Sequence, residues 1–251
     1  MEFAQAPNLP RVTSGMKGLD IILGGGYPKE RNILVAGPAG AGKSTIGLAF
    51  LVAGIIEQDE PGIYVSFDET LDNVRNDALS YGWDLKSLED QNLLAMIDGF
   101  SPRAGISSDE KYVCSIEIDE MINLLINLID SIGAERVVVD SITAIAVGID
   151  DEVTQRKEIL KLSAVMSALT CTTIMVSEMR TQDEVSTMGV EEFMTQGVIT
   201  LRYQFGQSGR RSIQVRKMRG VKHSLKERPF LITDQGPQVY PDEELYEFKS
   251  N

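Results

Sequence analysis

The chain has 251 residues, 43% of them hydrophobic and 24% charged, and it carries a formal net charge of −13. This length suits one domain over residues 1–251. The negative net charge counts against constitutive binding of nucleic acid. The longest apolar run, residues 46–56, is too short to cross a bilayer. The first residues lack the basic flank and apolar core of a signal peptide, and two cysteines are too few for a disulfide framework, so we expect a cytoplasmic protein.

The first clear element is a glycine-rich turn that follows an apolar segment. Residues 33–36 predict a buried strand, residues 44–57 predict a helix, and residues 37–44 fit the pattern G-x-x-x-x-G-K-[ST]. In this pattern backbone N–H groups surround phosphates, the lysine reaches the β- and γ-phosphates, and the serine hydroxyl ligates Mg²⁺. The turn therefore predicts a nucleoside triphosphate site formed by Gly40, Ala41, Gly42, Lys43, Ser44 and Thr45.

Two acidic residues follow the next predicted strand, residues 63–67. This strand delivers Asp68 and Glu69 to the edge of the sheet where the glycine turn lies, and either carboxylate is a candidate base for an attacking water. If the backbone stays extended, the two side chains point to opposite faces and only one reaches the γ-phosphate. The alternative is structural, because Thr70 is a candidate N-cap for a helix over residues 72–81 and a nearby acid favours the helix dipole.

A third carboxylate, Asp140, ends a further apolar strand. At the C-terminal end of a parallel strand it can orient the water shell of Mg²⁺, whereas taken alone it could cap the following turn. Strands alternate with helices here, which predicts an α/β fold with a mostly parallel sheet covered by helices on both faces. The remaining elements of this alternation are expected over residues 94–97 (strand), 116–132 (helix), 137–140 (strand), 153–169 (helix) and 173–177 (strand).

The C-terminal part changes to strand-like segments with short turns. Residues 197–205, 210–220 and 228–236 predict antiparallel strands at one edge of the sheet. On an extended strand, Ile213 and Val215 share a face with Lys217 and Arg219, so two cations could meet an anion where the strand leaves the core. The alternative is a solvated basic edge strand that protects against aggregation. The single histidine, His223, is a poor candidate for a general base because no carboxylate partner is visible.

With these elements in order, the chain resembles the KaiC-like branch of the RecA superfamily, and the likeness runs nearly end to end. One phosphate loop indicates only nucleotide binding, but seven collinear segments make the family assignment specific. The resemblance implies a RecA-like P-loop core that binds ATP with Mg²⁺. The segments are SGMKGLDIILGGGYPKERNILVAGPAGAGKST, GIIEQDEPGIYVSFDET, SYGWDLKSL, RVVVDSIT, MGVEEFMTQGVITL, KMRGVKH and PFLITDQG.

The resemblance also implies where the nucleotide lies. In the KaiC family it sits between neighbouring subunits of a ring, commonly a hexamer. Ser80 would lie near the base or ribose, and Lys217 and Arg219 would reach the γ-phosphate of the adjacent protomer, which makes these cations interface residues. The residues implied around that neighbour's base and ribose are Met218, Val221, His223, Thr233 and Asp234.

Two departures from the family pattern bear on activity. Asp68-Glu69 stands where the family usually has two glutamates, and the first of the pair is the water-activating position; aspartate is one methylene shorter, so we expect slow ATP hydrolysis. The Ser-Thr pair that KaiC phosphorylates on itself has no clear match. Ser186 and Thr187 lie in different surroundings, so self-phosphorylation is a subsidiary hypothesis.

These residues favour a ring-forming ATPase whose ATP state sets its assembly or its contacts with a partner. A first alternative is a DNA-associated recombinase paralogue related to RadA, which the negative net charge opposes. A second alternative is a module that does not hydrolyse ATP and in which ATP merely locks the ring, as in the archaellum accessory proteins of this family.

Overall fold

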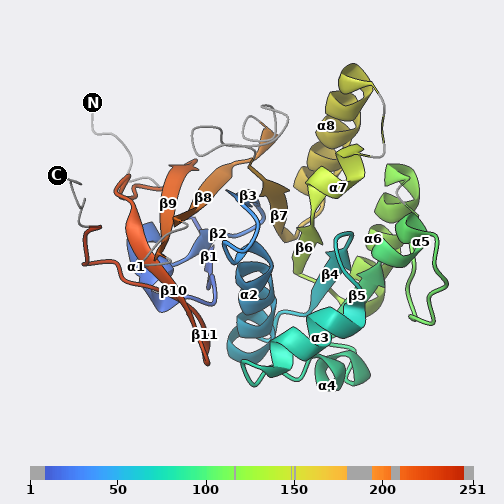
Figure 1. Cartoon of the computed structure of the whole chain (residues 1–251), viewed down its shortest axis with the longest axis horizontal. Helices are drawn as coiled ribbons and strands as arrows, with labels where there is room; N and C mark the ends of the chain where they lie inside the picture. The colour runs from blue at the N-terminus through green and yellow to red at the C-terminus, as the bar shows by residue number, and fades with distance from the viewer. Residues whose placement is uncertain are drawn as a thin grey trace.

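The computed structural model describes residues 9–245 except 116, 148, 150, 180–193 and 205–209. These residues form a large sheet with the strand order β11-β10-β9-β8-β3-β7-β6-β4-β5 and a small antiparallel pair of β1 (Arg11–Val12) and β2 (Tyr27–Pro28) (Figure 1). The strands of the large sheet are β3 (Asn32–Gly37), β4 (Gly62–Ser66), β5 (Leu94–Asp98), β6 (Arg136–Asp140), β7 (Thr172–Glu178), β8 (Gly197–Gln204), β9 (Arg210–Met218), β10 (Arg228–Thr233) and β11 (Gly236–Val239).

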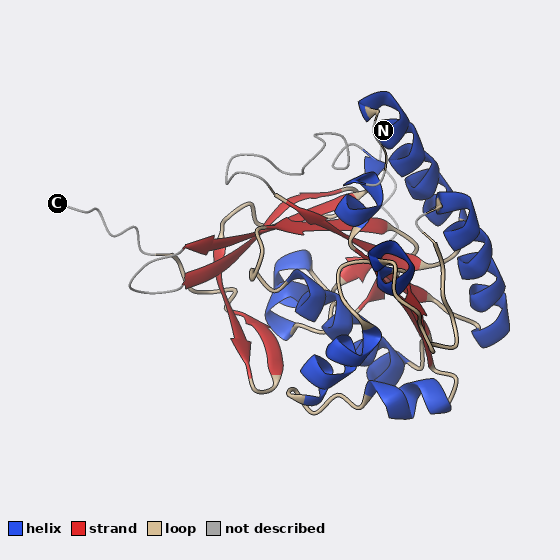
Figure 2. Ribbon diagram, turned by 45° about the vertical axis from the view of Figure 1, so that its right-hand side comes forward, coloured by secondary structure: helices blue, strands red, loops and turns tan. Residues whose placement is uncertain are grey.

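The strands from β8 through β3, β7, β6 and β4 to β5 are parallel, and β9, β10 and β11 continue the sheet antiparallel at one edge. This confirms the predicted mostly parallel sheet with an antiparallel C-terminal end. In Figure 2 these last strands extend to one side of the helix-covered part.

Helices cover both faces of the parallel strands. The helices are α1 (Lys17–Leu23), α2 (Lys43–Gln58), α3 (Leu71–Leu79), α4 (Leu85–Asp90), α5 (Phe100–Ala104), α6 (Ile118–Ile132), α7 (Ile142–Val147) and α8 (Glu152–Ala168). Helices α1 to α4 pack into one apolar core and α6, α7 and α8 into a second core on the other face. Alternate residues of β3 divide between these cores, Ile33 with the first and Leu34 with the second, because successive side chains of a strand point to opposite faces.

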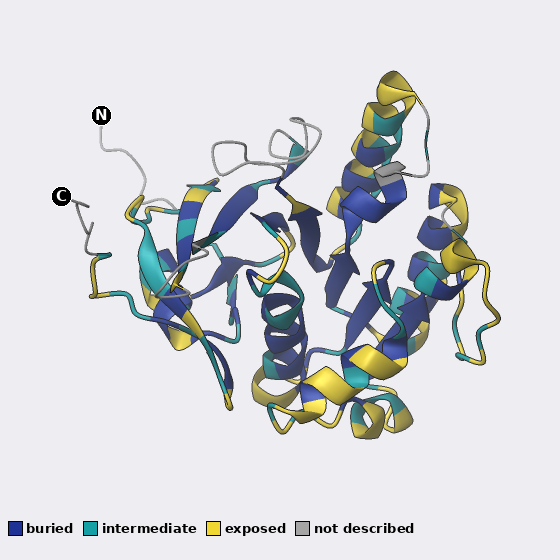
Figure 3. Cartoon of the chain, viewed as in Figure 1, coloured by how far each residue is buried: buried dark blue, intermediate teal, exposed yellow. Residues whose placement is uncertain are grey.

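The two-sided burial explains why the parallel strands read as nearly continuous apolar runs. Every residue of β3, β4, β5 and β6 is buried, and the middle of the sheet is dark blue in Figure 3, with exposed residues gathered on the outer turns of the helices. No helix in the described part of the chain is both long and apolar enough to cross a membrane.

A buried arginine joins the amino-terminal segment to the sheet. The Arg136 side chain is 0% exposed, forms an ion pair with Glu60 and donates hydrogen bonds to the backbone carbonyl oxygens of Thr13 (2.9 Å) and Phe50 (2.7 Å). It also hydrogen bonds to the Gln58 side chain. The guanidinium thereby ties together the start of the chain, the C-terminal part of α2 and the start of β6.

The register of β9 differs from the predicted simple alternation. Lys217 pairs with Val198, but Val215 pairs with Ile199, so one extra residue, Arg216, forms a β-bulge. The bulge reverses the alternation, and Met218, 4% exposed, follows Val215 into the first core. The expectation that Lys217 and Arg219 share a face with Ile213 and Val215 was therefore wrong; the two cations belong to the opposite side of the bulged strand.

Candidate functional site

The phosphate loop connects β3 to α2 as the motif predicts. Gly40 (φ 75°) and Gly42 (φ 98°) adopt the left-handed region, and a Cβ atom on Gly42 would lie 2.8 Å from the Cδ1 atom of Ile232. Gly42 is also the N-cap of α2, so the free N–H groups of the first helical turn face the loop. These are the features of a backbone anion cradle at a helix N-terminus.

Lys43 closes the loop from the helix side. Its Nζ atom donates a hydrogen bond to the backbone carbonyl oxygen of Pro38 at 3.1 Å. Burial lowers the pKa of Lys43, and the negative charges of Glu178, Asp140 and Asp68 oppose that shift. The lysine thus lies within electrostatic reach of carboxylates from three different strand ends.

Asp140 is the buried carboxylate of the site. Its side chain is 4% exposed, its Oδ2 atom accepts a hydrogen bond of 2.7 Å from the Tyr64 hydroxyl, and the Ser44 side chain lies near it. Burial raises the pKa of Asp140, whereas the hydroxyls of Ser44 and Tyr64 lower it. Ser44 and Asp140, the two residues expected at a bound Mg²⁺, therefore lie near each other, and their roles there stay a prediction.

This donor set fits Mg²⁺ bound together with a nucleotide. A serine hydroxyl and one carboxylate are hard oxygen ligands, and Mg²⁺ at phosphate sites keeps several waters and needs only one or two carboxylates besides the phosphate oxygens. The described residues contain no group of three or more His, Cys, Asp or Glu that could hold a metal by themselves. The site is therefore suited to metal that arrives with a triphosphate.

Asp68 and Glu69 both lie at the same edge as Asp140. Strand β4 ends at Ser66, so the backbone is no longer part of an extended strand at Asp68 and Glu69. The expectation that these two side chains point to opposite faces depended on an extended backbone and does not apply. Asp68 is within electrostatic reach of Lys43 and Asp140, its side chain is 46% exposed, and it lies 3.7 Å from the Arg103 guanidinium. Burial raises the pKa of Glu69, with the negative charges of Asp77, Asp140 and Asp68 adding to that effect.

The same segment also has the structural role that the sequence allowed, which is to cap helix α3. The Thr70 side chain accepts a hydrogen bond from the Asn73 N–H, so Thr70 is the N-cap of α3 as predicted. The Ser66 hydroxyl donates to the backbone carbonyl oxygen of Glu69 at 2.6 Å, which fixes the bend between β4 and the helix. A cap held by Thr70 leaves the carboxylates of Asp68 and Glu69 available for chemistry.

Three further residues lie at or near the phosphate loop, although the sequence analysis did not identify them. Glu178 ends β7 and acts on Lys43, just as Asp140 ends β6; its place after a buried strand was a usable signal. Tyr64 contacts Asp140 through the pairing of β4 with β6. Arg211 Nε, in β9, donates a hydrogen bond of 3.1 Å to the Gly40 carbonyl oxygen in the phosphate loop, a contact between segments far apart in the sequence.

Lys217 and Arg219 lie at the opposite end of the strands from the phosphate loop. Strand β9 runs antiparallel to β8, and Lys217 is level with Val198, near the amino end of β3, whereas the phosphate loop follows the carboxyl end. Lys217 Nζ donates to the Thr195 carbonyl oxygen at 2.6 Å, and the Arg219 N–H donates to the Gln196 carbonyl oxygen at 2.9 Å. With strands about 4.8 Å apart and β9 two strands from β3, neither cation contacts its own phosphate loop.

The neighbouring residues of this segment have different exposures. Met218 is buried in the core, so only its backbone is available to a ligand. Val221 is half-buried, and His223 is half-buried with Nδ1 3.2 Å from the Ser224 carbonyl oxygen. The structure brings Met218, Val221 and His223 together with Lys217 and Arg219, and away from the loop of the same chain.

The hairpin of β10 and β11 lies against its own phosphate loop. Gly42 packs on Phe230 and Ile232, and a Cβ atom on Gly236 would lie 2.6 Å from the Trp83 ring. Thr233 and Asp234 stand in the turn between these two contacts, with Thr233 Oγ1 donating to the Gly236 carbonyl oxygen. The turn thus approaches the loop of its own protomer, whereas the resemblance implied that Thr233 and Asp234 lie around the neighbour's nucleotide.

Ser80 belongs to the same side of the molecule. It ends α3 three residues before Trp83, is exposed, and donates its hydroxyl to the Asp77 carbonyl oxygen at 2.6 Å. Through Trp83 the segment that follows Ser80 meets the turn of β10 and β11. Ser186 and Thr187 lie outside the described residues.

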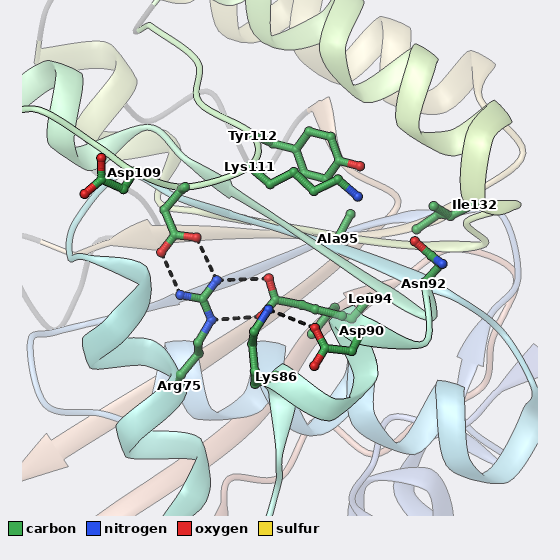
Figure 4. Close-up of a pocket in the computed structure, with 12 residues that line it drawn as sticks. Arg75, Lys86, Asp90, Asn92, Leu94, Ala95, Asp109, Lys111, Tyr112 and Ile132 are labelled. Carbon is green, nitrogen blue, oxygen red and sulfur yellow. Dashed lines mark hydrogen bonds and ion pairs between the residues drawn. The ribbon is translucent and has the colours of Figure 1, made fainter.

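A separate cavity of about 420 Å³ lies beside α3, α4 and the amino end of β5 (Figure 4). Arg75 forms ion pairs with Glu89 and Glu110, Lys86 pairs with Asp90, and Lys111 lies over the Tyr112 ring. Each basic side chain in the wall thus has a partner. The phosphate loop, and not this cavity, is therefore the candidate nucleotide site.

The fold and the site define a P-loop nucleotide-binding protein of the RecA type. Comparison with known proteins gives the family: residues 12–244 match the model described as the KaiC ATPase, and the chain belongs to that family.

Among relatives, a UPF0273 protein of Pyrococcus furiosus is 39% identical over 240 residues, which cover 94% of this chain and 96% of that protein. The circadian clock oscillator protein KaiC of Synechococcus elongatus is 34% identical over 235 residues, 93% of this chain but 44% of KaiC. The crystal structure of a KaiC-like protein from Pyrococcus horikoshii has a TM-score of 0.81 and 32% identity and covers 93% of this chain and 100% of that chain.

Proposed function

We propose that the protein is an ATPase that binds ATP with Mg²⁺ between neighbouring subunits of a ring, hydrolyses it slowly, and uses nucleotide occupancy to set its assembly. The observation that carries this proposal is the separation of the two halves of the site. Lys43, Asp68 and Asp140 lie together at one edge of the sheet, whereas Lys217 and Arg219 lie at the opposite edge.

Within one protomer, the residues divide the work as follows. The loop from Gly40 to Thr45 holds the phosphates, and Mg²⁺, when bound, neutralises charge on the β- and γ-phosphates. Ser44 ligates the metal and Asp140 orients its waters. Ser80, Thr233 and Asp234 contact the base or ribose of the nucleotide on their own chain, since the turn of β10 and β11 lies against that chain's loop.

The neighbouring protomer completes the site. Lys217 and Arg219 bring positive charge to the γ-phosphate, and such a cation supplied in trans is worth roughly 10³–10⁵ in rate. Val221, His223 and the backbone of Met218 lie beside these cations and line the same contact. Because this contact is head-to-tail, repetition by rotation closes a ring, and we propose a hexamer.

The distribution of charge supports such an interface. Residues 197–228 contain nine Lys and Arg and one Glu, whereas the rest of the chain holds 15 Lys and Arg against 36 Asp and Glu. The basic segment forms β8, β9 and the start of β10; Arg211 contacts the phosphate loop of its own chain, whereas Lys217 and Arg219 lie at the opposite end of the strands from Asp68, Glu69 and Asp140. A basic surface on one copy can therefore meet an acidic surface on the next.

Slow hydrolysis follows from the acid at position 68. Asp68 is one methylene shorter than glutamate and its carboxylate is shared with Arg103 at 3.7 Å. A misplacement of the base of about 1 Å can cost on the order of 100-fold in rate. The neighbouring Glu69, whose pKa burial raises, is the second candidate for this base.

Light scattering after size exclusion tests the proposal directly. The full chain is run with Mg²⁺ and a non-hydrolysable ATP analogue, then without nucleotide, beside the Arg219→Ala variant. We expect the nucleotide to convert wild-type protein to a ring and to do so far less in the variant. A wild-type protein that is saturated with nucleotide yet monomeric contradicts the proposal.

The same basic segment favours one other function, which is binding of nucleic acid. Nine cations concentrated on neighbouring strands could contact phosphates despite the negative total charge. DNA affinity that falls steeply with salt, together with DNA-stimulated ATP hydrolysis, would support that function. Single-turnover hydrolysis separates the remaining possibility, since an ATP-locked module that does not hydrolyse ATP releases no phosphate.

A further inference from the structure

We propose that Tyr64 is a positioning residue for the metal, whose hydroxyl fixes the Asp140 carboxylate in the orientation that Mg²⁺ requires. This inference rests on the proposed binding of ATP with Mg²⁺ and deepens it. The segment GIIEQDEPGIYVSFDET contains Tyr64, but the sequence analysis assigned this residue no role: it lies four residues before Asp68 and is brought to Asp140 by strand pairing.

The geometry comes from the register of β4 and β6. Ser66 pairs with Asp140 and Tyr64 pairs with Val138, so Tyr64 stands two residues before the partner of Asp140 and on the same face. Its hydroxyl reaches Asp140 Oδ2 at 2.7 Å, and both side chains are almost fully buried, at 0% and 4% exposed. Ser44, the proposed metal ligand, lies near both side chains.

The consequence is that one carboxylate oxygen has a fixed partner. A carboxylate that can rotate presents either oxygen to a metal-bound water, whereas a hydrogen bond to Oδ2 orients the group and directs Oδ1 to other partners. Tyr64 suits this task because its hydroxyl donates a hydrogen bond without adding a charge that would repel Mg²⁺. Outer partners of this kind typically account for 10–100-fold in metal affinity.

A purely structural explanation is that any buried tyrosine hydroxyl needs a partner. The same chain offers a counterexample, because Tyr27 is also 0% exposed and its hydroxyl has no hydrogen-bond partner among the described residues. Burial alone therefore does not require the contact that Tyr64 makes. Tyr27→Phe is accordingly the matched control for Tyr64→Phe, since each removes one buried oxygen and keeps the ring.

The experiment measures metal binding and not turnover. Mn²⁺ is titrated into the full chain with a saturating non-hydrolysable ATP analogue, and free Mn²⁺ is followed by electron paramagnetic resonance. We expect Tyr64→Phe to weaken Mn²⁺ binding by about 10–100-fold, while the affinity for the analogue without metal changes less than about twofold. Tyr27→Phe should bind Mn²⁺ as the wild type does.

Each outcome decides a different question. Wild-type Mn²⁺ affinity in Tyr64→Phe overturns the role of Tyr64 and leaves nucleotide binding intact. Failure of the wild-type protein to bind the analogue overturns the proposed function itself. Tyr64→Leu, which removes the same donor with different packing, should reproduce the loss, and melting followed by circular dichroism checks that each variant is folded.

Discussion

We expect turnover to depend most closely on Asp68 and Glu69. Both carboxylates lie within electrostatic reach of Asp140, but only Asp68 also acts on Lys43, and it is the more exposed of the candidates with Arg103 nearby. A base must lie within hydrogen-bond reach of the attacking water, directly or through one other water. The length of one side chain is therefore expected to control the rate without controlling affinity.

Substitutions at position 68 test this expectation. Asp68→Asn should abolish the remaining ATP hydrolysis while the dissociation constant for ATP stays the same, because the amide keeps the shape and removes the base. Asp68→Glu should raise the rate, by up to about 100-fold, since it restores the missing reach. Steady-state phosphate release and equilibrium nucleotide binding measure the two effects. Unchanged turnover in Asp68→Asn removes Asp68 from the mechanism and leaves Glu69→Gln as the variant to examine.

At this scale the sequence predicted what a local motif encodes. Lys43, Ser44 and Asp140 were predicted because each follows a strand or opens a helix in a short recognisable pattern. Tyr64 and Arg211 were not, because their contacts depend on which strands pair and in which register. Pairing between distant strands leaves no short signal in one sequence.

The helix α2 shows how an element is fitted to a single buried side chain. Gly54 lies in its interior, where alanine is ordinarily favoured over glycine by roughly 1 kcal/mol. A Cβ atom at this position would lie 2.1 Å from Arg136 Nε, within the guanidinium that ties α2 to β6. The absence of a side chain at Gly54 is what admits Arg136.

Gly54→Ala should therefore destabilise the protein, by about 1–3 kcal/mol, although helix propensity alone gives the opposite sign. Urea unfolding measures the free energy of unfolding. The double variant Gly54→Ala/Arg136→Met should lose less than the sum of the two single variants, because the shorter, uncharged side chain relieves the overlap. A stabilised Gly54→Ala would show that Arg136 does not occupy this position.

The long helices and most strands were predicted with small errors at their ends, whereas the short helices and the short strands β1, β2 and β11 were missed. The predicted helix at residues 153–169 is α8 (Glu152–Ala168), but α4 and α5 have only six and five residues. Such helices contain too few turns for periodicity to appear. The bulge at Arg216 was missed for a related reason, since alternation cannot show where one extra residue enters a strand.

In the whole molecule, the two groups of proposed site residues lie at opposite ends of the strands of the sheet. The carboxyl ends of β3, β4 and β6 carry the phosphate loop and the carboxylates, and the far end of β9 carries Lys217 and Arg219. Within one copy Lys217 and Arg219 lie away from the phosphate loop, so the proposed role of these cations requires a second copy. No sequence pattern in one chain indicates directly that a second copy is needed. The need follows from the direction of β9, which runs antiparallel to β8 and so carries Lys217 and Arg219 away from the phosphate loop.

Mixing two inactive variants tests this shared site most directly. One variant, Asp68→Asn/Glu69→Gln, lacks both candidate bases, and the other, Lys217→Ala/Arg219→Ala, lacks both cations, so each alone should hydrolyse almost no ATP. In rings assembled from an equal mixture, about a quarter of the interfaces combine an intact loop side with an intact cation side, and activity should return to that extent. If the mixture is as inactive as its components while mixed rings form, the cations do not act on a neighbour's nucleotide and the account is contradicted.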